Sequence, residues 1–216
     1  MAKTPIPPAA SDAEVRALLE RYRCPVPFHE VRTRFLGNIA SPVMAASPMS
    51  MVQGLWGGEL PEFASVENAN EFVGALVMGL WNRLTRHQER SQSFRLYRPD
   101  VAATRDGLGG IAQIRRQELD GLVEGLFGAE DHIDLPERAH KALGELAQMR
   151  ALFAGIVELC GDTAKPAPPK DIETTLRNVR EMTRIAETEI HALLLSCTRA
   201  RRQMLETLSV RRPTLH

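Results

Sequence analysis

Two pairs of glutamate and histidine are the residues whose types and spacing come nearest to a metal site. Glu137 and His140 are three residues apart, which on a helix puts the carboxylate and the imidazole on one side. Glu187 and His191 repeat the two residue types at a spacing of four. Di-iron centres in helical bundles need two Glu-x-x-His motifs and two further glutamates, so this set of ligands is incomplete. A metal-binding bundle, either a metalloenzyme or a metal store, is therefore the alternative hypothesis.

Other common signatures of catalysis and cofactor binding do not occur in the sequence. It contains no Gly-x-Ser-x-Gly elbow, no Walker loop, no Cys-x-x-Cys pair and no His-Glu-x-x-His motif. Gly107, Gly109 and Gly110 lie close together, but the stretch RDGLGG is typical of a turn. None of the cysteines has a paired histidine at a local spacing: Cys24, Cys160 and Cys197. We therefore expect no cofactor and favour a non-enzymatic protein.

Charge is balanced over the chain but unevenly distributed along it. The 27 basic and 27 acidic side chains cancel, which argues against a nucleic-acid coat or a binder of anionic membranes. Residues 83–116 carry eight arginines and three acids, whereas residues 117–137 carry seven acids and no basic residue. Complementary charged surfaces of this kind suit a protein partner or a second copy of the chain. The candidate partner-binding residues near the C-terminus are Arg199, Arg201 and Arg202.

Helical periodicity fills most of the chain, and no segment of convincing length has the period of a strand. We therefore predict an all-α fold, a multi-helix bundle with a long C-terminal helix. Ser11-x-x-Glu14 is a capping box, and Ser47-Pro48 places proline at a first helical position. The shorter predicted helices cover residues 11–22, 28–40, 48–56, 65–90, 111–127 and 136–159. Four aromatic residues are expected to share the core: Phe35, Trp56, Phe72 and Trp81.

Residues 171–208 are predicted to form one uninterrupted helix after a proline-rich linker at residues 161–170. Apolar and small residues alternate steps of four and three along it, which is the pattern of a heptad seam. The seam consists of Ile172, Leu176, Val179, Thr183, Ala186, Ile190, Leu193, Cys197, Ala200 and Met204. A helix of this length needs several neighbours from its own chain or the same helix of a second copy, and we favour a homodimer.

Composition predicts the ends of the chain and its location. Residues 1–10 are proline-rich and expected to be disordered, and residues 209–216 form a basic tail. The start lacks the apolar core of a secretory signal, and the longest nearly apolar run, residues 73–81, is far shorter than the ~20 residues that span a bilayer. Three widely spaced cysteines imply no disulfide framework. We expect a cytoplasmic protein with no membrane partner.

A series of short motifs runs between residues 35 and 87. A helix ending in a small residue and proline, at Ser41-Pro42, precedes the proline-initiated helix that starts at Ser47-Pro48. An acidic P-x-F turn at residues 61–63 and a helix that ends in Trp81-Asn82 complete the series. In this order, the motifs resemble the YecA/YgfB-type family of bacterial proteins. The family is all-helical and its members are mostly uncharacterised.

The resemblance implies that residues 11–160 form one helical domain of this type. Many family members carry a C-terminal cysteine–histidine zinc motif, which this sequence replaces with the long helix. A metal or adaptor role that belongs to that motif is therefore not implied here. We expect a helical interaction or regulatory protein that acts through protein–protein contacts. Because no aromatic residue is interleaved with the C-terminal arginines, nucleic acid is not expected as a partner.

Overall fold

The structure is a computed structural model that describes residues 10–43, 47–164 and 168–210, with the backbone alone for residues 208–210. Over these residues the protein is all-helical and has no strand, which confirms the predicted fold class. None of the helices, over the same part of the chain, has a stretch apolar enough to span a bilayer. Most of the predicted N-terminal lead and basic tail lies outside the described residues, as do residues 165–167 of the predicted linker.

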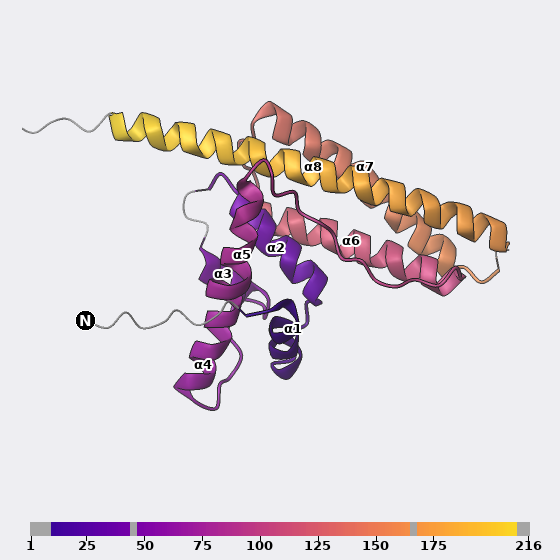
Figure 1. The fold of residues 1–216 in the computed structure, drawn as a ribbon, viewed down its shortest axis with the longest axis horizontal. Coiled ribbons are helices and arrows are strands. Elements are labelled where there is room, and N and C mark those ends of the chain that lie inside the picture. The colour runs from indigo at the N-terminus through magenta and orange to yellow at the C-terminus, as the bar shows by residue number, and fades with distance from the viewer. Residues whose placement is uncertain (1–9, 44–46, 165–167, 211–216) are drawn as a thin grey trace, which may run out of the picture.

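The order of elements follows the sequence prediction closely, and Figure 1 labels the α-helices. In chain order the helices are α1 (Asp12–Arg21), α2 (Phe28–Ala40), α3 (Pro48–Gly54), α4 (Val66–Val73), the π-helix η1 (Gly74–Trp81), α5 (Asn82–Leu84), the 3-10 helix η2 (Thr85–Gln88), α6 (Arg105–Phe127), α7 (Glu137–Gly161) and α8 (Pro169–Val210). The predicted capping box is present, since the Ser11 side chain accepts from the backbone N–H of Glu14 and the Glu14 carboxylate from that of Ser11. Ser47 caps α3 as predicted, with Pro48 at its first position.

Helices α6, α7 and α8 run alongside one another and form the elongated part of the molecule, while α2 packs across α6 and joins it to α1 and α3–α5 (Figure 1). Glycines allow the backbones of α2 and α6 to approach closely. A Cβ atom added at Gly125 would overlap the carbonyl group of Arg34 on α2. A Cβ atom at Gly121 would lie 2.8 Å from Cγ of Glu30. The close packing of α2 on α6 therefore depends on glycine at positions 121 and 125, because any larger residue would overlap α2.

The predicted helix over residues 65–90 is one continuous helical stretch whose pitch changes three times: from α to π at η1, back to α at α5, and then to 3-10 at η2. The core position predicted for its Trp81 is wrong in part, because the indole is half-buried at the edge of the core. Its Nε1–H donates to Oδ1 of Asn38 at 3.1 Å, and that of Trp56, also half-buried, donates to the carbonyl of Tyr22 at 3.0 Å. Both indole N–H groups thus find an acceptor within the chain, as an indole removed from water requires.

Helix α6 begins at Arg105, which shows that the turn predicted for RDGLGG is wrong. Thr104 caps the helix, and its Oγ1 accepts a hydrogen bond from the backbone N–H of Gly107 at 3.1 Å. Gly109 then faces α7, where an added Cβ atom would lie 3.1 Å from Cβ of Cys160. The cap and this close approach outweigh the low helix propensity of glycine, about 1 kcal/mol per residue.

The long predicted helix is present as α8, and its predicted seam is buried from Ile172 to Cys197. The neighbours that bury it are α7, α6, α2 and η2 of the same chain. A second copy is therefore not needed to cover this part of the seam. Beyond Cys197 the cover ends, since Ala200 is half-buried and Met204 is exposed.

Between η2 and α6 the chain has no regular secondary structure over residues 92–102. This 92–102 segment runs back along the bundle to the start of α6 (Figure 1). Phe94 and Leu96 on it are buried, so the segment is part of the core rather than a surface loop. The buried charges described below hold it in place.

Candidate interaction surface

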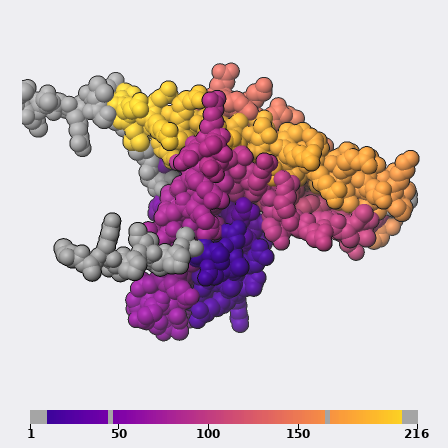
Figure 2. All heavy atoms as spheres, viewed as in Figure 1, coloured from indigo at the N-terminus to yellow at the C-terminus, as the bar shows by residue number. Residues whose placement is uncertain are grey.

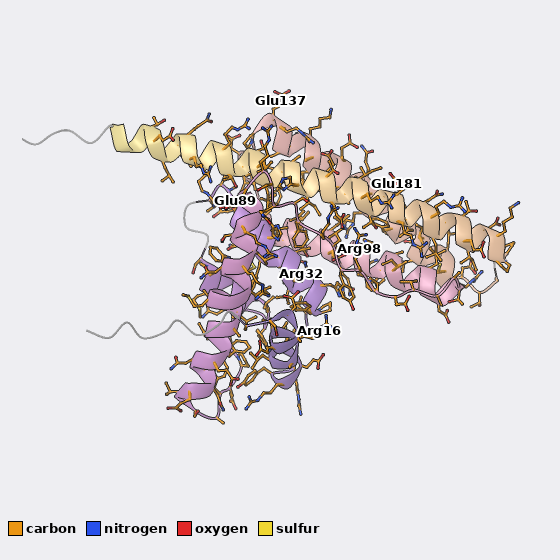
Figure 3. The ribbon with its side chains drawn as sticks, in the orientation of Figure 1. Arg16, Arg32, Glu89, Arg98, Glu137 and Glu181 are labelled. Atoms are coloured by element: carbon orange, nitrogen blue, oxygen red, sulfur yellow. The ribbon has the colours of Figure 1, made fainter. Side chains whose placement is uncertain are left out.

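The structure does not bring the four candidate metal ligands into one site. Glu137 and His140 lie exposed near the start of α7, and Glu137 points away from the bundle in Figure 3. His191 is half-buried on α8, where its Nε2 atom lies 3.3 Å from the carbonyl oxygen of Arg90. Among the described residues, no group of three histidine, cysteine, aspartate or glutamate side chains is placed to hold a metal ion.

Glu187 binds arginines of its own chain instead of a metal. Its side chain is only 2% exposed, and Nη2 of Arg98 lies 2.6 Å and 2.9 Å from its two carboxylate oxygens. Nη1 of Arg95 donates to the same carboxylate at 2.8 Å, and the backbone N–H of Leu96 donates at 3.0 Å. Both oxygens are thus engaged, and they fasten the 92–102 segment to α8.

A second buried pair fastens the same segment to α6. Arg115 and Glu118 are almost completely buried and form an ion pair. Arg115 also donates from Nε to Oγ1 of Thr183 at 3.0 Å and from Nη2 to the carbonyl of Tyr97. Glu118 accepts the backbone N–H of Tyr97 at 2.7 Å. Burial raises the pKa of Glu118 to about 7, although the Arg115 charge acts in the opposite direction.

Sequence reasoning missed this buried arginine–glutamate network, which consists of Arg95, Arg98, Arg115, Glu118 and Glu187. The available signal was the position of Arg115 and Glu118 on α6, three residues apart and on the same side as buried apolar residues. An arginine–glutamate pair at that spacing is usually a surface pair, and only the tertiary fold shows that this one is buried.

Of the three candidate partner-binding arginines, Arg201 is used within the chain. Its Nη2 donates to the carbonyl of Ile39 at 3.0 Å and its Nη1 to that of Ser41 at 3.2 Å. These carbonyls lie at the C-terminal end of α2, where a cation is favoured by the helix dipole. Burial lowers the pKa of this guanidinium from its usual value. Arg201 therefore anchors α8 to α2.

Arg199 and Arg202 remain on the surface and line an open groove of about 490 Å³ between α8 and the end of η2. Arg90 and Glu89 lie on the opposite side of this groove, and Figure 3 shows Glu89 just beneath α8. Thr198 at its base is buried, and its hydroxyl has no hydrogen-bond partner in the described part of the chain. The groove thus combines exposed charges of both signs with an unsatisfied polar atom.

Beside this groove, the last turns of α8 expose apolar side chains. Met204 is 40% exposed and Leu205 is 45% exposed. Figure 1 shows this end of α8 reaching past the other helices, and in Figure 2 it forms one margin of the molecule. We define the α8 end surface as Arg199, Arg202, Met204, Leu205 and Glu206.

Comparison of the chain with protein-family models, with curated protein sequences and with solved structures finds no match. The resemblance of residues 35–87 to the YecA/YgfB-type family therefore stays a prediction.

Proposed function

We propose that this protein is a non-enzymatic helical interaction protein that self-associates through the α8 end surface. One observation carries the proposal: the apolar seam of α8 continues to Met204, with the exposed Leu205 next to it, after the bundle stops covering it. Exposed apolar side chains that extend a buried seam are typical of a contact surface. The proposed domain is of the all-helical type suggested by the resemblance to the YecA/YgfB-type family.

A second copy of the chain is the occupant that suits this surface best. In an antiparallel, two-fold pair centred on Met204, each helix covers the apolar turn of the other. The contact is short, so we expect a reversible dimer with a dissociation constant in the micromolar range.

Sedimentation velocity over a range of protein concentrations, extending well above the expected micromolar dissociation constant, tests the proposal. The wild-type chain should sediment with twice the mass of 24.0 kDa, whereas the double variant Met204→Asp/Leu205→Asp should sediment as a single chain. Ile185→Asp is the matched control, because Ile185 is also exposed on α8, at 47%, but lies far from the end surface. The control should keep the mass of the dimer.

Two outcomes would contradict the proposal. If the folded wild-type protein sediments with the mass of one chain, the protein does not self-associate. Equal masses for the wild type and the double variant would place the contact elsewhere on the molecule.

We also propose that the protein works in the cytoplasm. The support is that its three cysteines are free thiols: Cys24, Cys160 and Cys197. Burial raises the pKa of Cys197 to about 11, so this thiol has little tendency to form the reactive thiolate. Free thiols persist most readily in a reducing compartment.

A further inference from the structure

We propose that a pocket between the 92–102 segment, α6 and α8 binds a small phosphomonoester. The pocket has a volume of about 340 Å³, at the lower end of the range for small-molecule sites. Four arginines from three separate elements converge on it: Arg98, Arg115, Arg180 and Arg184. Among the described lining residues, Asp100 is the single acid. Arginine binds phosphate oxygens through paired hydrogen bonds, which makes such a cluster an anion site.

The floor of the pocket is rigid. Arg115 is only 2% exposed, and its guanidinium is fixed by Glu118, by Thr183 and by the carbonyl of Tyr97. Each terminal guanidinium nitrogen carries two hydrogens, so these bonds leave donors over for a ligand. A donor that is already held in place loses little freedom when the ligand arrives.

The mouth of the pocket carries positive charge that the chain neutralises only in part. Arg180 is exposed and has no ion-pair or hydrogen-bond partner within the described residues. Arg184 pairs with Glu181 at 3.0 Å, but both side chains are well exposed, and such surface pairs are weak. Arg180 and Arg184 are four residues apart on α8, where like charges repel. A doubly charged phosphate group between them would relieve this repulsion.

Apolar residues on the walls explain why an ester suits the pocket better than free phosphate. Ile111, Leu176 and Val179 face the cavity from α6 and α8. These side chains can cover the organic part of a phosphomonoester but offer nothing to a bare anion. The carboxylate of Asp100 can accept a hydrogen bond from a hydroxyl group of the ligand and orient it. Figure 3 shows Arg98 beside α6, on the segment that closes this side of the pocket.

Isothermal titration calorimetry at physiological ionic strength tests the inference with three probes: glycerol 3-phosphate, inorganic phosphate and pyrophosphate. Glycerol 3-phosphate should bind more tightly than inorganic phosphate. Arg180→Gln and Arg184→Gln should each weaken its binding about tenfold, the effect of one lost charged hydrogen bond. Arg177→Gln is the matched control, because Arg177 is exposed on the same helix but does not line the pocket. The control should change affinity less than about twofold.

The inference is wrong if none of the three probes binds. It is also wrong if Arg177→Gln weakens binding as much as Arg180→Gln does. Equal affinity for inorganic phosphate and glycerol 3-phosphate would overturn the assignment of an ester. The pocket lies on the first half of α8, away from the α8 end surface. The two arginine variants should therefore leave the sedimentation behaviour of the protein unchanged.

Discussion

Glu118 is a carboxyl group whose burial makes the stability of the protein depend on pH. Its pKa rises from 4.5 to about 7 on folding because burial disfavours the charged form. Between these values the folded chain holds a proton that the unfolded chain has released. The contribution of Glu118 to the free energy of unfolding is therefore complete below pH 4.5. It decreases as the pH rises towards 7, so the protein becomes less stable over this range.

Replacing Glu118 by glutamine should flatten this pH dependence, because glutamine does not titrate. Urea unfolding at about pH 5 and about pH 7 measures the slope for the wild type and the variant. Glutamine stands in for the neutral carboxyl group that the folded wild type holds near pH 5, so the variant should not lose stability through this group as the pH rises to 7. Glu130→Gln is the control, since Glu130 is exposed after α6 and should leave the slope intact. A slope in Glu118→Gln equal to that of the wild type would show that Glu118 does not titrate in this window.

The candidate site could be predicted from the sequence only where a residue acts without distant partners. Arg199 and Arg202 are exposed on α8, as their position in an arginine-rich helix end indicated. Arg201, between them, binds carbonyls of α2 that are about 160 residues away in the sequence, and no local pattern encodes that contact. Glu187 shows the same limit, because its arginine partners lie on a segment whose path depends on the whole fold.

At the scale of the element, the bundle of the same chain covers the seam of the long helix from Ile172 to Cys197. Ile190→Asp places a charge where the side chain is completely buried against the same chain. Burial of an unpaired charge should lower the free energy of unfolding by more than about 4 kcal/mol. Thermal unfolding followed by circular dichroism measures the loss, and Ile185→Asp on the exposed side is the control. A melting temperature within a few degrees of the wild type for Ile190→Asp would show that the seam is not packed in this way.

Most helices could be predicted because their start signals and their apolar faces agree. The Ser11 capping box, the Ser47-Pro48 start and the seam of α8 are all local patterns, and each one is present in the structure. The first turn of α6 could not be predicted, because its glycines resemble a turn until the packing of Gly109 against α7 is known. The π-helical pitch of η1 likewise has no local signal that we recognised.

At the scale of the whole molecule, the crossing of α2 and α6 joins the N-terminal helices to the three long ones. Two buried glycines of α6, Gly121 and Gly125, set the distance between these helices. At the present distance between the helices, a β-carbon at either position would overlap atoms of α2. Position 125 therefore controls how the two parts of the molecule fit together.

Gly125→Ala should separate α2 from α6 and lower the free energy of unfolding by about 1–3 kcal/mol, as overpacking in a core does. Gly144→Ala is the matched control, because Gly144 lies in the middle of α7 with no atom within 4 Å of an added Cβ. That change should raise the free energy of unfolding by about 0.5–1 kcal/mol, since alanine loses less backbone freedom in a helix. Urea unfolding of the two variants should thus give shifts of opposite sign. A stabilised Gly125→Ala variant would show that α2 and α6 are farther apart than the structure places them.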